Sequence, residues 1–518
     1  MPQSDPITPL TPAEQAFVDH LDATSNRDQV IGWLKRDLQT AIEIELATIP
    51  IYLNTYYSLV RNTTTGEGLG PLEQFVNKAG GVIMSVAVEE MLHMSLSSNV
   101  LFSLGVAPQL YGRAPKQYPT PLPYHKRVGP KGPHGGTDVL IPQARLSFEQ
   151  LWHFLQIEYP EQWNDPPQDR EWQTIGQFYS YIRCLISTKF VTDADFQNGP
   201  SASAIQPFNY SPNNVDTVYP TGKFDPWTPA PPVPPPSWAA APSASAAAVY
   251  PDAPDSHAGP AELVTVSSRR DAAIAIDTIC DQGEGYPTPN VGPGPDDDPS
   301  KDEESHYMKF LTLQAQYAEY TGTTEHLPAQ PTPPPQQMPI MHDSDLLKAQ
   351  LVVDFPDNPT TASYPAQYQP IAAFCSACFQ YMLIMTETIY RVPPAKQKLF
   401  FNEALHRSMI WVLDKYIRTI RDIPLGSGKY MAPVFENVDL GARENSFKAL
   451  IAYGANAIAA AYTVSAGLDP KSDLYQAMTN VIYYVCVATP QPDSTYTGRT
   501  LPDVGPYWAG VRQSGGQQ

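Results

Sequence analysis

Two Glu-x-x-His pairs constrain the fold of this 518-residue chain more than any other feature. The pairs are Glu90 with His93 and Glu303 with His306. On an α-helix, residues three positions apart lie on one face, one turn apart. The first pair lies on the same stripe as apolar residues such as Ile83, so it should face a core. A carboxylate and an imidazole in a core are costly unless they are paired, hydrogen-bonded or bound to metal.

Two single glutamates on the neighbouring predicted helices complete a recognisable set. Glu45 lies on an apolar helical stripe before the first pair, and Glu284 ends the helix before the second pair. A four-helix bundle that binds two metal ions takes one Glu from each of two helices and a Glu-x-x-His from each of the other two. The predicted metal ligands are therefore Glu45, Glu90, His93, Glu284, Glu303 and His306.

Hydrophobic periodicity predicts a mainly α-helical protein. The four core helices are expected at residues 28–59, 71–104, 267–282 and 303–320, in two antiparallel hairpins. Because Glu284 ends one helix and Glu303 begins the next, the metals are expected towards the loop 285–301. That loop would then form a rim of the substrate entrance.

The segment 106–263 is expected to be the long crossover between the second and third helices. Within it we predict a short strand at 137–141 and helices at 147–158 and 176–186. Residues 200–260 are rich in Pro, Ala and Ser, a composition with little capacity to bury a core.

A helical C-terminal extension is expected after a second proline-rich connector at residues 327–370. Its helices are predicted at 371–391, 394–423, 445–466 and 472–488. We therefore predict a metal-binding bundle at 1–326, with the insertion at 106–263, a helical region at 371–490 packed on the bundle, and a tail at 491–518.

A competing ligand set remains open in the C-terminal half. Glu403 and His406 form a third Glu-x-x-His pair, and Glu387 lies on the preceding predicted helix. In principle these residues could replace Glu284, Glu303 and His306. Arg407, beside His406, offers a salt-bridge explanation for part of this set.

Composition excludes several classes of function. The formal net charge of −20 disfavours nucleic acid and anionic membranes as partners, because both need clustered Lys and Arg. The five cysteines are too few for a disulfide framework, and the Cys375-x-x-Cys378 pair is expected to be buried thiols. No signal peptide and no apolar run long enough to span a bilayer are recognised. A cytoplasmic protein is expected.

Four sequence blocks carry a resemblance to a known family. They are AIEIELATIP (41–50), VEEMLH (88–93), QGEG (282–285) and ESHY (304–307). Together they resemble the ferritin-like domain family that includes the iminophenyl-pyruvate dimer synthases, the chromopyrrolate-type enzymes of the violacein, rebeccamycin and staurosporine pathways. The resemblance implies a ferritin-like four-helix bundle with proline-rich crossover insertions, in which the six predicted residues bind metal.

The expected function is that of a non-haem di-iron oxidoreductase. Two iron ions would act with O₂ or peroxide on a small, amino-acid-derived molecule of secondary metabolism. A carboxylate-rich site with two imidazoles favours iron over zinc. The alternatives are an iron-storage protein and a structural protein with a degenerate metal site. The oligomeric state is left open, with a homodimer as one option.

Overall fold

The computed structural model describes residues 8–60, 70–129, 132–197, 264, 266–283, 305–321, 344–392, 400, 413–426, 428–472, 475 and 503–509. The chain divides into two compact units, which are described separately. The first comprises Met1–Pro108, Tyr118–Lys223 and Pro254–Asn358, and the second comprises Gln109–Gln117, Phe224–Ala253 and Pro359–Gln518.

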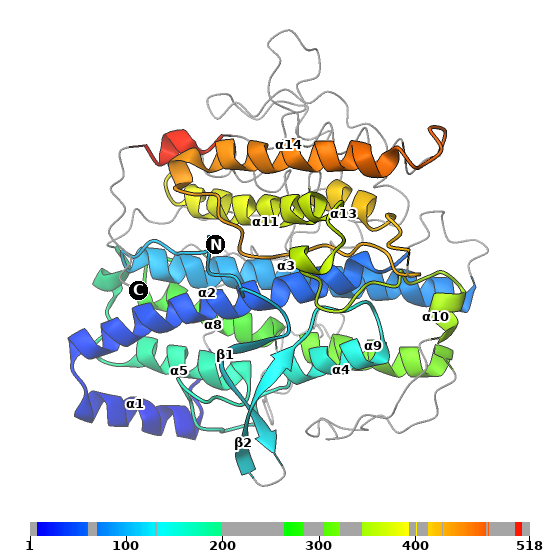
Figure 1. Ribbon diagram of the computed structural model, residues 1–518. Helices are drawn as coiled ribbons and strands as arrows, with labels where there is room; N and C mark the ends of the chain where they lie inside the picture. Colours follow the sequence, from blue (N-terminus) through cyan, green and yellow to red (C-terminus); the bar gives the residue numbers. More distant parts are fainter. Residues whose placement is uncertain are drawn as a thin grey trace, which may run out of the picture. The chain divides into compact units, whose positions relative to one another are not determined.

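Two long helices, α2 (Arg27–Tyr57) and α3 (Pro71–Ser103), pack against one another and form half of a bundle in the first unit (Figure 1). Asn26 caps α2 by accepting a hydrogen bond from the Gln29 amide at 3.0 Å. Pro50 lies inside α2 without ending it. Gly105, with φ = 84°, follows the end of α3, where a left-handed conformation favours glycine.

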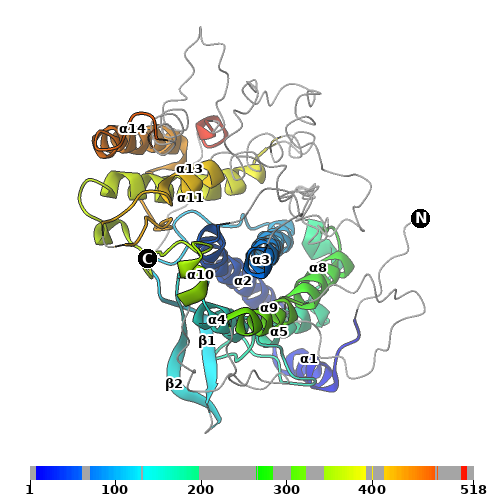
Figure 2. The ribbon, with the colours of Figure 1, turned by 90° about the vertical axis from the view of Figure 1, so that its right-hand side faces the viewer.

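The other half of the bundle consists of two interrupted helices. The first is formed by α4 (Phe148–Ile157) and α5 (Ile175–Ser187), and the second by α8 (Arg269–Gln282) and α9 (His306–Thr321). Helix α4 packs on α9, α5 packs on both α8 and α2, and α3 contacts both α8 and α9. In Figure 2, α2 and α3 are seen nearly end-on beside these shorter helices.

This arrangement corrects two sequence expectations. The helices at 147–158 and 176–186, placed in the crossover, belong to the bundle itself. The expected antiparallel hairpin of α8 and α9 is also wrong, because these helices follow one another along the bundle (Figure 1). The His306 amide donates to the Gly283 carbonyl at 2.8 Å, which joins the end of α8 to the start of α9. The intervening loop, with the predicted entrance rim at 285–301, lies outside the described residues.

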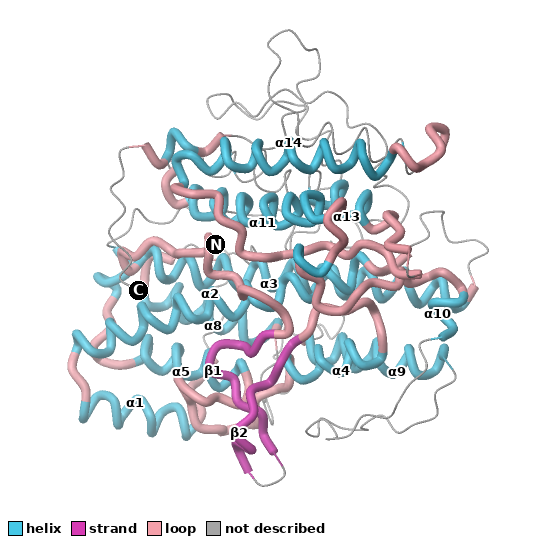
Figure 3. The backbone as a smooth tube through the Cα atoms, in the orientation of Figure 1, coloured by secondary structure: helices cyan, strands magenta, loops and turns pink. Residues whose placement is uncertain are grey.

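Smaller elements complete the first unit. Strands β1 (Thr120–Gly129) and β2 (Gly132–Ile141) form an antiparallel hairpin, drawn in magenta in Figure 3, which includes the predicted strand at 137–141. Helix α1 (Pro12–Thr24) packs on α5. The remaining described elements are η1 (Asp193–Gln197) and α10 (Ser344–Lys348). The proline-rich stretch 200–260 lies outside the described residues.

The second unit is built around α11 (Gln369–Ile389), which packs against α14 (Ser446–Ser465) and α13 (Asp414–Ile420). The predicted helices at 371–391 and 445–466 are confirmed. Most of the predicted helix at 394–423, and all but two residues of the one at 472–488, lie outside the described residues. Among the described residues of this unit, short 3₁₀ segments occur at Thr361–Ser363, Arg443–Asn445 and Gly505–Tyr507.

Helix α11 is long and apolar enough to cross a bilayer by length and composition, contrary to the sequence expectation. However, 94% of its most apolar stretch is buried inside the protein, which is equally typical of a core helix. Cys375 and Cys378 lie on this helix as buried free thiols, as predicted.

Candidate metal centre

Four of the six predicted ligands come together in the middle of the bundle. Glu45 projects from α2, Glu90 and His93 from α3, and His306 is the first residue of α9. Each is 3% exposed or less. The position near the middle of α2 and α3 contradicts the expected location at one end of the bundle, because α8 and α9 meet end to end at this level. Glu284 and Glu303 lie outside the described residues.

A fifth acidic residue, Glu158, joins the cluster. It is the C-terminal cap of α4 and is 2% exposed. The potential ligand atoms form two triads, within each of which they lie within 4.8 Å of one another. The His93 triad consists of Glu45, Glu90 and His93, and the His306 triad consists of Glu90, Glu158 and His306. Glu90 therefore belongs to both.

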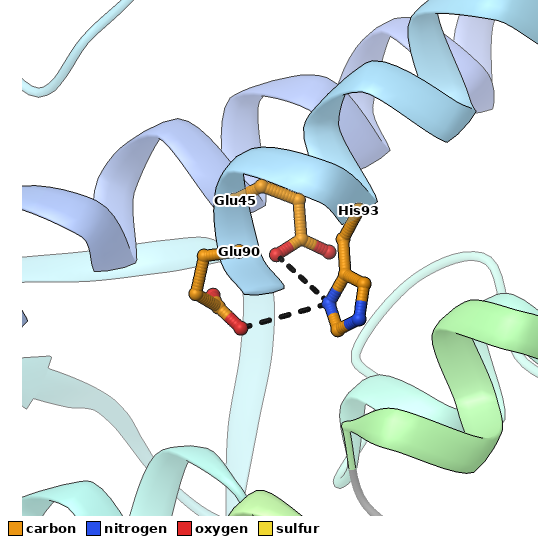
Figure 4. A group of neighbouring side chains, drawn as sticks. All are labelled: Glu45, Glu90 and His93. Carbon is orange, nitrogen blue, oxygen red and sulfur yellow. Dashed lines mark ion pairs between the residues drawn. The ribbon is translucent and has the colours of Figure 1, made fainter. Parts of the chain in front are cut away.

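The distances show how the triads share Glu90. In the His93 triad, drawn in Figure 4, Nδ1 of His93 lies 3.6 Å from Oε1 of Glu90 and 3.9 Å from Oε2 of Glu45. In the His306 triad, Nδ1 of His306 lies 3.2 Å from the same Glu90 oxygen and 3.4 Å from Oε2 of Glu158. Oε1 of Glu90 thus lies between the two imidazoles.

Hydroxyl groups hold the other oxygen of each carboxylate. Tyr179, on α5, donates to Oε1 of Glu45, and Tyr52, on α2, donates to Oε1 of Glu158. The Thr48 hydroxyl contacts Oε2 of Glu90. Each of the three carboxylates therefore uses one oxygen to contact a hydroxyl group and turns its other oxygen towards an imidazole. This arrangement orients one oxygen per carboxylate towards the space between the histidines.

The two histidines have different partners at Nε2. His306 Nε2 lies 2.6 Å from Oε2 of Glu89, whereas His93 Nε2 lies 3.3 Å from Oε1 of Gln282. In the neutral imidazole, each acceptor favours a proton on Nε2 and leaves the Nδ1 lone pair facing the shared Glu90 oxygen. Both imidazoles are therefore arranged to donate electrons through Nδ1.

Burial and crowded negative charge govern the protonation of this site. Burial and the charge of Glu90 raise the pKa of Glu45 well above its ordinary value. Burial and Glu90 likewise raise the pKa of Glu158. For Glu90 itself, burial is outweighed by His306 and His93, which hold its pKa below the usual range. Such a concentration of buried carboxylates is stabilised by a cation.

Neighbouring charges also shift the pKa values of His306 and Glu89. Burial alone would lower the pKa of His306, but Glu158, Glu89 and Glu90 outweigh it and raise the pKa well above its ordinary value. Burial alone would raise the pKa of Glu89, but Lys309 and His306 lower it to about 2. A metal ion would replace the proton that the carboxylates otherwise attract to His306.

A cavity of about 20 Å³ adjoins the triads, enough for about one water molecule. Its walls combine the ligand candidates with residues from the start of α5 and the end of α8. The lining residues are Glu45, Glu90, His93, Glu158, Ile175, Gly176, Tyr179, Ile279, Cys280 and Gly283. The described walls admit only a very small molecule.

The donor set fits divalent metal ions. Two donor atoms that each lie about 2.1 Å from one ion are about 3 to 4 Å apart, and the separations between imidazoles and carboxylates fall in this range. In addition, Nδ1 of His306 is buried and makes no hydrogen bond to any residue that the structure describes. A buried nitrogen that faces two carboxylate oxygens, without a hydrogen bond among the described residues, is the arrangement expected of a metal ligand.

Glu158 is not among the predicted ligands because its helix was expected in the crossover. The signal was present: Leu151, Leu155 and Glu158 follow a helical stripe whose last member is acidic, like the stripe that contains Glu45.

The competing ligand set of Glu387, Glu403 and His406 is less plausible because Glu387 has other partners. Its carboxylate accepts the Leu110 and Tyr111 amides at 2.7 and 2.9 Å and pairs with Arg443. Glu403 and His406 lie outside the described residues.

One family model covers most of the bundle. The ferritin-like family model matches residues 38–220 and 245–315. Among solved structures, a ferritin-like protein from Caulobacter vibrioides matches with 17% identity and a TM-score of 0.37, covering 74% of this chain and 95% of its own. No curated protein matches the chain. The predicted ferritin-like fold is confirmed, whereas the narrower resemblance to chromopyrrolate-type enzymes stays a prediction.

Proposed function

Because the chain carries a ferritin-like domain, in a superfamily that includes di-iron proteins, we propose that it is a non-haem di-iron oxidoreductase that reacts with O₂ or peroxide. The observation that carries this proposal is the pair of buried triads that share Glu90. One carboxylate between two imidazole-containing triads suits a bridging ligand for two ions.

In this proposal each triad holds one ion. Glu45 and His93 would hold the first, Glu158 and His306 would hold the second, and Glu90 would contribute to both. Glu158 supplies the single glutamate that we had expected from Glu284. Glu303 remains a predicted ligand through its Glu-x-x-His spacing with His306, and four carboxylates would balance the charge of two divalent ions.

Iron bound there would supply the electrons that reduce O₂ or peroxide. The residues of the chain would orient the carboxylate ligands and restrict access to the metal ions. Tyr179, Tyr52 and Thr48 hold the carboxylate oxygens that face away from the imidazoles. The small cavity limits access, so that the described walls favour a diatomic or similarly small oxidant.

The reducing substrate is proposed to be a small, amino-acid-derived molecule of secondary metabolism in the cytoplasm. The proposed substrate class rests on the resemblance of the sequence blocks, and the proposed location rests on the sequence expectation alone. Neither nucleic acid nor a membrane is proposed as a partner, in keeping with the net charge of −20.

Anaerobic iron loading followed by single-turnover O₂ consumption tests the proposal. We expect two Fe²⁺ ions per chain, a single burst of O₂ uptake matched to that iron, and loss of the burst in His306→Ala. Glu149→Gln, which removes a charge from an exposed position of α4, serves as the control and should retain both. Continued oxidation and retention of excess iron would instead indicate storage. Failure of the wild-type protein to bind iron would show a degenerate site.

A further inference from the structure

Glu89 is next to Glu90 in the sequence, but its carboxylate has a different set of partners. Glu89 is fully buried. The Ser85 hydroxyl donates to Oε1 at 2.7 Å, and the Lys309 ammonium lies 3.0 Å from Oε1 and 2.7 Å from Oε2. His306 Nε2 is 2.6 Å from Oε2. Both carboxylate oxygens are therefore occupied by donors from α3 and α9.

These partners distinguish the carboxylate of Glu89 from that of Glu90. Lys309 is one helical turn beyond His306, so both reach the same carboxylate from one face of α9. The ammonium balances the buried charge of Glu89, whereas the three carboxylates of the triads have no such described ion pair with lysine or arginine. Glu89 is consequently placed to act on His306 rather than to bind an ion directly.

The corresponding contact of His93 is much weaker. Its Nε2 faces the neutral amide oxygen of Gln282 at 3.3 Å, while His306 Nε2 faces an anionic oxygen at 2.6 Å. A carboxylate that accepts the imidazole proton fixes the ring and makes the opposite nitrogen a stronger donor. The negative end of the Glu89–Lys309 pair is also the end that contacts the imidazole.

We propose that Glu89, held by Lys309, is a positioning residue that makes the two metal positions unequal, so that the position beside His306 binds a divalent ion more tightly than the position beside His93. This inference rests on the two-metal centre of the proposed function. It further implies that the centre fills in order, the His306 triad first.

Anaerobic titration with Co²⁺ alone, followed by its visible absorption, tests this order. The wild-type protein should bind two ions in separate steps. Glu89→Gln should weaken the tighter ion by about 10- to 100-fold and change the spectrum of the first ion bound, so that the steps merge. Gln282→Leu, the matched change behind His93, should weaken only the second ion and separate the steps further. Glu149→Gln is the exposed Glu-to-Gln control.

In Glu89→Gln, His306 loses its anionic hydrogen-bond acceptor and Lys309 loses its ion pair. A double variant distinguishes the effects of these two losses. Glu89→Gln/Lys309→Met removes both charges, and we expect the tighter ion to remain weakened in a protein whose circular dichroism matches the wild type. Equal affinities in the wild type, or a tighter ion unaffected by Glu89→Gln and by the double variant, would overturn the inference while leaving a two-metal centre. A wild-type protein that binds no Co²⁺ would overturn both proposals.

Discussion

The substitution Glu158→Gln tests whether Glu158, which the structure places in the centre, is a metal ligand in place of Glu284, which the sequence suggested. The glutamine keeps a carbonyl oxygen that can still accept the Tyr52 hydroxyl, so the shape of the site is retained. It removes a buried charge whose pKa is raised by burial and by the nearby Glu90. The metal-free variant should therefore be no less stable than the metal-free wild type.

Metal binding should reverse this comparison. At a free metal concentration of 100 times Kd, each ion bound only by the folded state stabilises it by about 2.7 kcal/mol. If Glu158→Gln does not bind the ion of the His306 triad, the folded variant lacks this stabilisation of about 2.7 kcal/mol. For a cooperatively folded unit of 150–250 residues, a range that includes the described part of the first unit, the metal-induced rise in Tm of the variant should be smaller than that of the wild type by roughly 5–11 °C.

The assay combines thermal unfolding, with and without metal, and metal analysis. We expect the bound metal to fall from two ions to one in Glu158→Gln, and the metal-induced rise in Tm to shrink accordingly. Glu284→Gln, measured in parallel, should retain two ions. If Glu284→Gln loses an ion while Glu158→Gln keeps both, the assignment of Glu158 is refuted and the sequence prediction is correct.

Three further predictions concern other buried groups of the first unit. Arg183→Met should lower the free energy of unfolding in urea by about 3–5 kcal/mol, because Glu14, which pairs with Arg183 and is equally buried, is left without its main partner. The double variant Arg183→Met/Glu14→Gln should recover part of this loss. Burial lowers the pKa of His125 from 6.5 to about 4, so the unfolded chain takes up the proton first and stability should fall by about 2 kcal/mol between pH 7 and pH 5. His125→Gln should flatten that dependence in urea unfolding, and an unchanged slope would contradict it. Tyr179→Phe removes the hydroxyl that holds Glu45, a bond to a charged group worth about 1.5–3 kcal/mol, and should weaken one bound ion by about 10- to 100-fold in metal titration. Equal weakening of both ions would argue against an effect confined to the His93 triad.

Local sequence patterns were sufficient to predict individual helices. The Asn26 cap, the apolar stripe of α2 and the glycine after α3 set the limits of two helices by interactions within a few residues. The Glu-x-x-His spacing placed Glu90 and His93 on one helix face for the same reason. Such features depend on helix geometry and backbone hydrogen bonding, which a short stretch of sequence specifies.

The pairing of helices depended on contacts between distant segments. The sequence alone did not reveal that α4 and α5 belong to the bundle, or that α8 and α9 meet end to end rather than side by side. A loop of unknown path is compatible with both arrangements, and only the burial of apolar faces between helices selects one. For this one reason Glu158 was missed, and the centre was expected at one end of the bundle instead of near its middle.

The sequence by itself determined that Glu45, Glu90, His93 and His306 lie on apolar helical faces, since that follows from periodicity. Only the tertiary structure decided that Oε1 of Glu90 faces both histidines, that Glu158 joins them, and that Glu89 contacts His306 and Lys309 instead. The adjacent residues Glu89 and Glu90 are chemically identical in the sequence. Their side chains leave α3 in directions about 100° apart, and the helices packed on each side determine which carboxylate meets an ammonium and which meets two imidazoles.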